Sequence, residues 1–215
     1  MNIRGVTFLV LVGSVAVIRR DLLVRLIRAL DRRGGLFARR GARAYARGSR
    51  PFSGLYRRVA ADAAAMVGDR DATIIDIGSG PGDLLAALRA FVPSARLVGV
   101  EPSDAMRAIA AERGVMSVDG HAEALPFADG TVDLVLSTLS SHHWDDVSGG
   151  FAEIRRVLHP GGEARIYDVR FAGYGPLEAR RFGSEAGFGA DGIGHRILDE
   201  RMLGFHPYAL ITLRA

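Results

Sequence analysis

A glycine-rich segment between two carboxylates has the residue types that most directly point to chemistry. Asp76 lies in an apolar stretch, Gly78, Gly80 and Gly82 follow at alternate positions, and Asp83 comes next. Glycines allow a tight turn and a close approach of a ligand to the backbone, and a helix that starts after the turn offers unpaired N–H groups. The G-x-G-x-G spacing lacks the third glycine of a dinucleotide fingerprint. The two carboxylates therefore favour a ligand with a cationic amine.

A second acidic position follows the next apolar stretch. Glu101 comes 19 residues after Gly82, at the end of the run Leu97-Val98-Gly99-Val100. An acid at the tip of a second strand accepts hydrogen bonds from the two hydroxyls of a ribose. A solvated surface glutamate is the alternative, but the apolar strand before Glu101 favours the binding role.

Two adjacent histidines are the candidates for acid–base chemistry. His142 and His143 follow the apolar stretch 132–138, and an imidazole is the commonest general base in enzymes. Adjacent side chains rarely point the same way, so we expect only one of the two to face a site, and either could instead cap or pack a helix start. Asp168, at the end of a later predicted strand, either faces the same pocket or pairs with a nearby arginine.

Alternating strand and helix patterns place these residues in a parallel sheet. Strands separated by helices imply βαβ units, and ligands bind at the carboxyl edge of such sheets. We expect helices at 52–67, 82–91, 103–113 and 145–158, strands at 73–77, 96–101, 115–119, 132–138 and 163–169, and two closing strands at 192–197 and 208–214 with no full helix between them.

Composition excludes several kinds of chemistry. The 215 residues include no cysteine, which rules out disulfides and thiolate metal sites. All 28 basic residues are arginine, so a lysine Schiff base and a P-loop lysine are excluded as well. The sequence also lacks an H-E-x-x-H pattern, and we expect no metal site.

The charge distribution divides the chain into an arm and a body. Residues 1–58 hold 14 arginines and two acids, whereas the rest holds 14 arginines and 22 acids. We therefore predict an N-terminal arm over residues 1–50 and one globular domain over residues 51–215.

Within the arm, two segments suit a membrane surface. Residues 5–18 form an apolar run of 14 residues, short of the about 20 that a spanning helix needs. Residues 21–33 have the pattern of a basic amphipathic helix, and residues 36–50 read as a linker or a loosely helical arm. Residues 1–33 can thus meet an anionic membrane or pack on the domain or a partner. We expect the protein in the cytoplasm, with the arm at the inner face of the membrane.

From residue 52 to residue 214 the sequence resembles the class I S-adenosylmethionine-dependent methyltransferases, in their small-molecule subgroup. Matching segments are Asp76–Gly82, Glu101-Pro102-Ser103, the stretch 120–127, the stretch 129–137, the stretch 153–162 and Ala186-Gly187-Phe188. The resemblance implies a Rossmann-like fold with a mostly parallel seven-stranded sheet, helices on both faces and an antiparallel last strand.

The resemblance also implies S-adenosylmethionine as the cofactor and a set of residues that bind it. These residues are Asp76, Gly78, Ser79, Gly80, Gly82, Glu101, Pro102, Met106, His121, Ala122 and Ser137. Met106 corresponds to the residue that packs against adenine. His121 stands where the family usually has an aspartate that contacts the adenine amino group, and a neutral imidazole can accept the same hydrogen bond.

The expected activity is methyl transfer to a small-molecule or lipid-like acceptor, with His142 or His143 as the base. Nucleic-acid acceptors are disfavoured, because no [DNS]-P-P-[YF] segment follows residues 132–138 and the arm lacks aromatic residues interleaved with its arginines. Two alternatives remain: a non-catalytic protein that binds S-adenosylmethionine, and an RNA methyltransferase that uses the arginine-rich arm.

Overall fold

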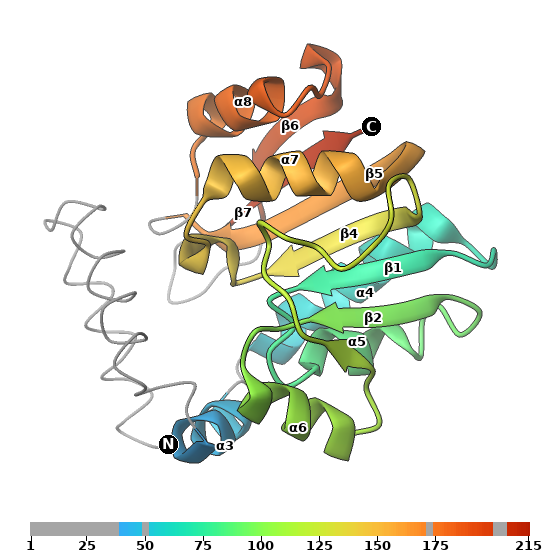
Figure 1. Ribbon diagram of the computed structural model, residues 1–215, viewed down its shortest axis with the longest axis vertical. Helices are drawn as coiled ribbons and strands as arrows, with labels where there is room; N and C mark the ends of the chain where they lie inside the picture. Colours follow the sequence, from blue (N-terminus) through green and yellow to red (C-terminus); the bar gives the residue numbers. More distant parts are fainter. Residues whose placement is uncertain (1–38, 49–51, 171–173, 200–205) are drawn as a thin grey trace, which may run out of the picture.

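The computed structural model describes residues 39–48, 52–170, 174–199 and 206–215. One seven-stranded sheet forms its centre, in the order β3-β2-β1-β4-β5-β7-β6 (Figure 1). The strands are β1 (Thr73–Ile77), β2 (Arg96–Val100), β3 (Ser117–Val118), β4 (Val132–Thr138), β5 (Leu158–Val169), β6 (Ile193–Ile197) and β7 (Tyr208–Arg214).

Five strands of the sheet are parallel, and β7 runs antiparallel between β5 and β6. This arrangement confirms the predicted fold, a mostly parallel sheet with an antiparallel last strand. The chain order reverses between β1 and β4, which lie side by side, so the carboxyl ends of these two strands form the switch point of the sheet. The candidate site residues follow these strand ends.

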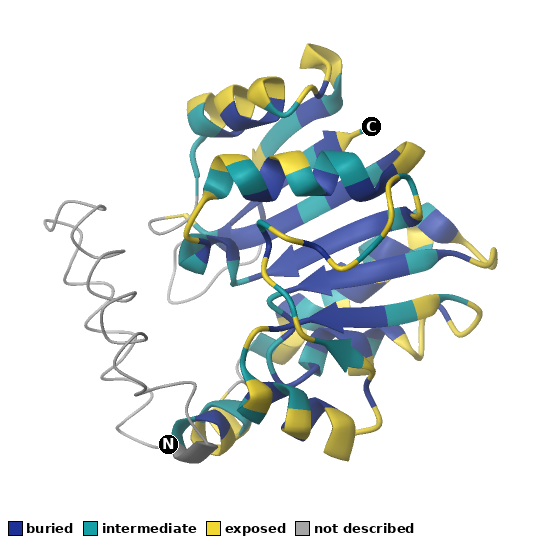
Figure 2. Cartoon of the chain, in the orientation of Figure 1, coloured by how far each residue is buried: buried dark blue, intermediate teal, exposed yellow. Residues whose placement is uncertain are grey.

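Helices cover both faces of the sheet because the strand residues alternate in direction. The described α-helices are α3 (Arg39–Gly48), α4 (Ser53–Val67), α5 (Asp83–Leu88), α6 (Asp104–Glu112), α7 (Val147–Val157) and α8 (Pro176–Glu185). Two short 3₁₀-helices, η2 (Ser141–His143) and η3 (Ala190–Gly192), complete the described helical elements. Ile74 packs in a core with residues of α4 and α5, whereas its neighbour Ile75 packs in a core with residues of α7 and α8. The central strands are therefore buried along most of their length (Figure 2).

Several elements differ from the sequence-based expectation. A ten-residue helix, α8, precedes β6, although we predicted no helix in that part of the chain. β5 begins at Leu158, directly after α7, because Leu158 pairs with Val132 before a shift in register brings Glu163 opposite Leu134. The strand predicted at 115–119 is only two residues long, and the helix predicted at 82–91 ends at Leu88.

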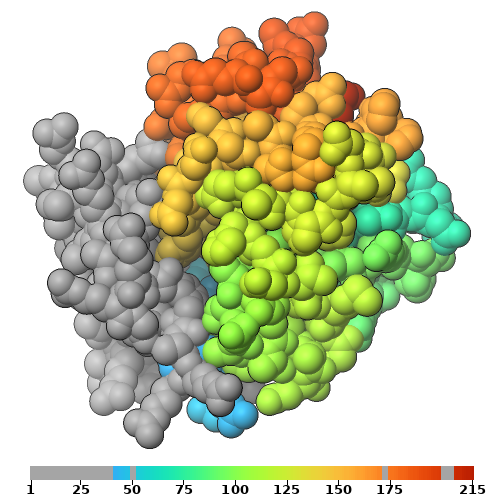
Figure 3. Space-filling view, viewed as in Figure 1, coloured from blue at the N-terminus to red at the C-terminus, as the bar shows by residue number. Residues whose placement is uncertain are grey.

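Residues 1–38 of the predicted arm lie outside the described residues, and they include the apolar run 5–18 and the predicted helix 21–33. Within the described ranges, no helix is both long and apolar enough to cross a membrane. Residues 39–48, which we expected as a linker or a loose helix, form α3 and contact α6. In the space-filling view, the blue residues of α3 lie beside the green residues of α6 (Figure 3).

Candidate functional site

The turn after β1 is shaped by three glycines with left-handed backbone conformations. Gly78, Gly80 and Gly82 have φ angles of 71°, 52° and 82°, a region that other residues adopt only at a cost. The backbone N–H groups of Gly78 and Ser79 both donate to the carbonyl of Val100, at 2.8 and 3.2 Å. The glycine turn is thereby tied to the end of β2.

Gly78 also brings the turn close to the segment after β4. A methyl group on Gly78 would overlap the side chain of Ser140. The hydroxyl of Ser140 donates to the carbonyl of Ile77 at 2.8 Å and lies 2.8 Å from the hydroxyl of Ser137. Since η2 begins at the next residue, Ser141, the two predicted histidines lie close to the glycine turn.

Asp76 is a buried carboxylate whose charge is not balanced within the described residues. Its side chain is 2% exposed, and its Oδ1 atom has no hydrogen-bond partner among the residues that the structure describes. Burial raises the pKa of Asp76 well above its ordinary value, and the nearby charge of Glu101 raises it further. A buried acid in this state gains most from a ligand that brings a positive charge or a hydrogen-bond donor.

Glu101 is held in place by backbone donors. The N–H of Gly80 donates to its Oε2 atom at 2.9 Å, and the N–H of Ser103 donates to its Oε1 atom at 2.9 Å. An acidic side chain at this place in an open α/β sheet is the type of group that accepts the hydroxyls of a ribose. Its position directly after β2 matches the sequence-based expectation for a ribose-binding acid.

Two tyrosines near these acids were not predicted as site residues. Burial, followed by the charges of Asp83 and Glu101, raises the pKa of Tyr45 to about 12. Burial also raises the pKa of Tyr56, with further contributions from Tyr45, Asp83 and Asp76. Tyr45 lies on α3 and Tyr56 on α4, so these two helices bring an aromatic side chain to the acidic end of β1 and β2.

Arg113 links α3 to the glycine turn. Its guanidinium donates to the carbonyl of Pro81 at 3.0 Å, to the carboxylate of Asp83 at 2.8 Å and to the carbonyl of Ala46 at 3.4 Å. Ala46 is the neighbour of Tyr45, so Arg113 fixes the position of Tyr45 relative to the turn. Tyr45 is the only aromatic residue of α3. A single aromatic residue among arginines, alanines and glycines is the one sequence signal that could have indicated Tyr45 as a site residue.

The other predicted cofactor residues lie around the same edge. Met106 is 1% exposed and packs with Ala42 and Ile109, so its contact with adenine stays a prediction. The Ser79 hydroxyl lies 3.3 Å from that of Ser117. The side chain of Ser79 is thus engaged with β3, and Ser79 contributes to the glycine turn through its backbone. The remaining predicted cofactor residues lie near the ends of β2, β3 and β4. Pro102 and His121 are exposed, whereas Ala122 and Ser137 are buried.

At the ends of β4 and β5 the structure brings a histidine and an aspartate together. Nδ1 of His142 lies 2.8 Å from Oδ1 of Asp168, whose side chain is 6% exposed. The ring of His143 is stacked at a tilt on that of His142, with 4.2 Å between centroids. Leu139, between β4 and η2, has a φ angle of 58°. Such strained backbone is concentrated at functional sites.

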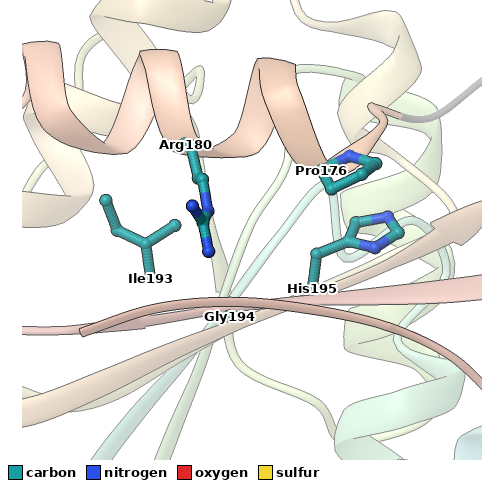
Figure 4. A pocket seen from close by; sticks show the side chains of 5 residues that line it. All are labelled: Pro176, Arg180, Ile193, Gly194 and His195. Atoms are coloured by element: carbon teal, nitrogen blue, oxygen red, sulfur yellow. The ribbon is translucent and has the colours of Figure 1, made fainter. Parts of the chain in front are cut away.

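A separate cavity lies at the edge of the sheet, between α8 and β6 (Figure 4). Its lining residues are Pro176, Arg180, Ile193, Gly194 and His195. The volume is about 190 Å³, below the range of about 300 to 1,000 Å³ that is typical of small-molecule sites. The cavity also lies on the outermost strand rather than at the switch point. We therefore assign the candidate site to the carboxyl ends of β1, β2, β4 and β5.

The fold and the carboxyl edge of the sheet are typical of a methyltransferase domain, and comparisons with known proteins agree with this class. The family model of a methyltransferase domain matches residues 75–166. A putative S-adenosylmethionine-dependent methyltransferase from Methanococcus maripaludis superposes with a TM-score of 0.66 at 23% identity, over 82% of this chain and 93% of the other. At that identity the superposition shows the fold alone.

Curated relatives extend the match to the sequence. The uncharacterized methyltransferase YdaC of Bacillus subtilis is 32% identical over 54% of this chain and 67% of its own length. A demethylmenaquinone methyltransferase of Chlorobaculum parvum is 36% identical over 47% of this chain and 42% of its own length. The chain spans less than half the length of several curated relatives that it matches. It belongs to the class I S-adenosylmethionine-dependent methyltransferases, as the sequence resemblance predicted.

Proposed function

We propose that the protein transfers a methyl group from S-adenosylmethionine to a small-molecule or lipid-like acceptor. The observation that carries this proposal is the pair of buried acids at the ends of two adjacent strands. Asp76 and Glu101 are 2% and 8% exposed and flank a turn of three left-handed glycines. A non-catalytic protein would not require the histidine and aspartate that lie beside this turn.

The residues present fit the cofactor. The Oδ1 atom of Asp76, which has no hydrogen-bond partner among the described residues, suits the cationic end of the ligand. The carboxylate of Glu101, held at the end of the second strand, suits its ribose hydroxyls. The tyrosine rings of α3 and α4 are of the residue type that binds organic cations through their faces. When bound, the cofactor supplies a methyl group on a positively charged sulfur, so the protein mainly has to align the acceptor and exclude water.

The acceptor class rests on two observations. Proteins of similar sequence are named demethylmenaquinone methyltransferases, a name that points to a quinone rather than a nucleic acid as their acceptor. The segment after β4 reads Leu139-Ser140-Ser141-His142, and therefore lacks the motif of methyltransferases that act on base amino groups. Both observations favour a small apolar acceptor over a nucleic acid.

Calorimetric titration of the full-length chain with S-adenosylmethionine tests the cofactor assignment. We expect micromolar affinity, weakened about tenfold or more in Glu101→Ala, because hydrogen bonds to a charged group contribute about 1.5 to 3 kcal/mol each. Glu101→Gln keeps the shape of the side chain and removes its charge, so it measures the contribution of the charge to the affinity. Glu185→Gln, an exposed glutamate on α8, is the matched control and should bind like the parent. A folded parent that binds no S-adenosylmethionine would contradict the proposed function.

We further propose that residues 1–33 hold the enzyme at an anionic membrane surface. The support is the sequence alone: an apolar run, then an amphipathic segment with Arg25, Arg28, Arg32 and Arg33. Flotation with anionic vesicles should recover the full chain with the lipid, and replacing these four arginines by glutamine should reduce the recovery. Equal recovery with anionic and zwitterionic vesicles would remove the electrostatic part of the proposal.

A further inference from the structure

The pair formed by His142 and Asp168 is the most complete polar arrangement at the acceptor side of the sheet. Asp168 is the penultimate residue of β5, and His142 is the middle residue of η2. The two residues are 26 positions apart in sequence. They meet because β4 and β5 are neighbours and η2 follows β4 directly.

The carboxylate of Asp168 accepts hydrogen bonds on both oxygens. Oδ1 accepts from the N–H of Val169 at 2.8 Å and lies 2.8 Å from Nδ1 of His142. Oδ2 accepts from the Ser141 hydroxyl and from the N–H of His142, the latter at 3.1 Å. Burial by itself would raise the pKa of Asp168, but His142 and these hydrogen bonds outweigh it and lower the pKa. Asp168 is therefore ionised at neutral pH.

An ionised carboxylate at Nδ1 determines where neutral His142 carries its proton. The carboxylate can only accept, so Nδ1 must be the donor. The lone pair of the neutral ring then lies on Nε2, the nitrogen that exchanges protons with an acceptor. Of the two adjacent histidines, His142 is the one whose ring nitrogen contacts Asp168.

The pair also lies where an acceptor has to meet the cofactor. Ser140 packs against Gly78 of the glycine turn, and Ser141 and His142 follow it in η2. The hydroxyl of Tyr174 donates to the carbonyl of Ser141 at 3.0 Å, which fixes η2 from the side of α8. The imidazole is thus held between the cofactor turn and the end of β5.

We propose that His142 is the general base, that Asp168 is its positioning residue, and that the acceptor is a phenolic or enolic hydroxyl compound. This inference rests on the proposed function. Nε2 of His142 takes the proton of the acceptor hydroxyl, and the oxygen forms a bond to the methyl carbon. The bond between methyl carbon and sulfur breaks, and its electron pair stays on sulfur. Asp168 stabilises the imidazolium, which then releases its proton to solvent.

The hydroxyl class follows from proton chemistry. A neutral amine can attack a methyl group before it loses a proton, so it does not require a base in the transition state. A hydroxyl is a weak nucleophile until its proton leaves, and a positioned base accelerates such a step by about 10² to 10⁴. A carboxylate that leaves the lone pair of the histidine on Nε2 therefore suits the second kind of acceptor.

Nitrogen-15 NMR of the ligand-free full chain tests the pair without any acceptor. In the parent, we expect the neutral form of the His142 ring to carry its proton on Nδ1. Asp168→Asn should move the proton to Nε2, because the amide of asparagine can donate to Nδ1. His142→Gln assigns the signal, and His159→Gln, an exposed histidine, is the control that leaves it unchanged. A parent with the proton on Nε2 would overturn the proposal, even where Asp168→Asn does not fold.

Turnover with an acceptor panel tests the substrate class. Phenols, hydroquinones and enols are compared with amines, with formation of S-adenosylhomocysteine as the readout. For a hydroxyl acceptor, Asp168→Asn should lower kcat about 100-fold while the affinity for S-adenosylmethionine, measured by calorimetry, changes less than about twofold. Turnover of amines alone, or a kcat that does not depend on Asp168, would overturn the inference. Loss of cofactor binding in the parent would instead overturn the proposed function.

Discussion

The two halves of the sheet's carboxyl edge are built by different means. At the ends of β1 and β2, the backbone forms the site: three glycines take left-handed conformations, and N–H groups hold Val100 and Glu101. At the ends of β4 and β5, side chains form it, through the pair of His142 and Asp168. The proposed cofactor half therefore depends on backbone conformation, and the proposed acceptor half depends on charged side chains.

The two buried aspartates show the same contrast in their protonation. Burial and Glu101 raise the pKa of Asp76, which has one oxygen without a partner among the described residues. Despite its burial, Asp168 has a lowered pKa, because His142 and several hydrogen bonds stabilise its charge. Under the proposed function, a ligand supplies the missing partner of Asp76, whereas the protein itself supplies the partners of Asp168.

The largest effect is expected from a methyl group in the glycine turn. Gly78→Ala combines a left-handed φ angle of 71° with an overlap on Ser140. Strain costs about 1 to 2 kcal/mol and overpacking about 1 to 3 kcal/mol, so we expect a loss of about 2 to 5 kcal/mol in the free energy of unfolding. Urea denaturation measures this loss, and calorimetry should show that cofactor binding falls at least tenfold.

Gly80→Ala is the matched control for that substitution. Gly80 has a φ angle of 52°, but a methyl group there would have no neighbour within 4 Å. It therefore adds strain without overlap, and we expect a loss of only about 1 to 2 kcal/mol. Equal losses for the two variants would show that the contact between Gly78 and Ser140 contributes nothing to the site.

The next effect concerns the acceptor half. Asp168 has a lowered pKa in the folded state, so its contribution to stability is present above its ordinary pKa and is lost as the pH falls through the folded value. At pH 7, Asp168→Asn should lower the free energy of unfolding by about 1.5 to 3 kcal/mol, since it replaces hydrogen bonds to a charged group by hydrogen bonds to a neutral one. Below about pH 4 the difference between variant and parent should shrink. A difference that stays constant from pH 7 to pH 3 would contradict an ionised Asp168.

Asp76 should show the opposite dependence on pH. Its pKa is raised in the folded state, so its contribution is fully present below its ordinary pKa and is lost as the pH rises through the folded value. Asp76→Asn should therefore gain in stability relative to the parent as the pH rises from about 4 to 8, reaching about 1 kcal/mol. Denaturation of both proteins across this pH range measures the gain.

The ligand provides the control for Asp76. A cationic ligand favours the ionised acid, so S-adenosylmethionine should release protons from the parent but not from Asp76→Asn. Calorimetry in two buffers of different ionisation enthalpy counts these protons. The test is made at a pH where the parent is still losing stability relative to Asp76→Asn. If the parent binds S-adenosylmethionine there without releasing protons, Asp76 does not contact the cationic end of the cofactor.

The same contrast explains how much the sequence predicts. The glycine turn and Glu101 lie in contiguous segments of apolar strand and turn residues, whose spacing is visible in the sequence and follows from backbone geometry. The strand and helix order could be predicted for the same reason. The pairing of Asp168 with His142 could not, because it requires knowing which way η2 turns after a strained Leu139.

For a related reason, α8 was not predicted and α3 was expected only as a linker or a loose helix. α3 consists mainly of arginine, alanine and glycine, and it is stabilised by its contacts with Met106 and Arg113 rather than by an apolar stripe of its own. In α8, only Ala179, Phe182 and Gly183 are buried, too few to give a periodic signal. The helix start is nevertheless well defined, since Glu178 accepts from the N–H of Gly175 at 2.9 Å.

The smallest effect is expected where α3 meets the glycine turn. Arg113→Ala removes the donor that joins Ala46 to Pro81 and Asp83. This side chain is 32% exposed, and partly exposed ion pairs contribute at most about 1 kcal/mol. We therefore expect faster hydrogen exchange in residues 41–48 and a two- to fivefold loss of affinity for S-adenosylmethionine, about 1 kcal/mol or less.

Arg43→Ala is the matched control on α3 itself. Arg43 is 67% exposed and lies 3.5 Å from Glu112, so it joins α3 to α6 without reaching the glycine turn. Hydrogen exchange should rise slightly in Arg43→Ala, while the cofactor affinity stays that of the parent. If both variants bind like the parent although exchange in α3 rises, α3 packs beside the cofactor site without contributing to it. If only Arg113→Ala binds S-adenosylmethionine more weakly, α3 contributes to the cofactor site through Arg113, although the sequence analysis assigns this helix to the arm.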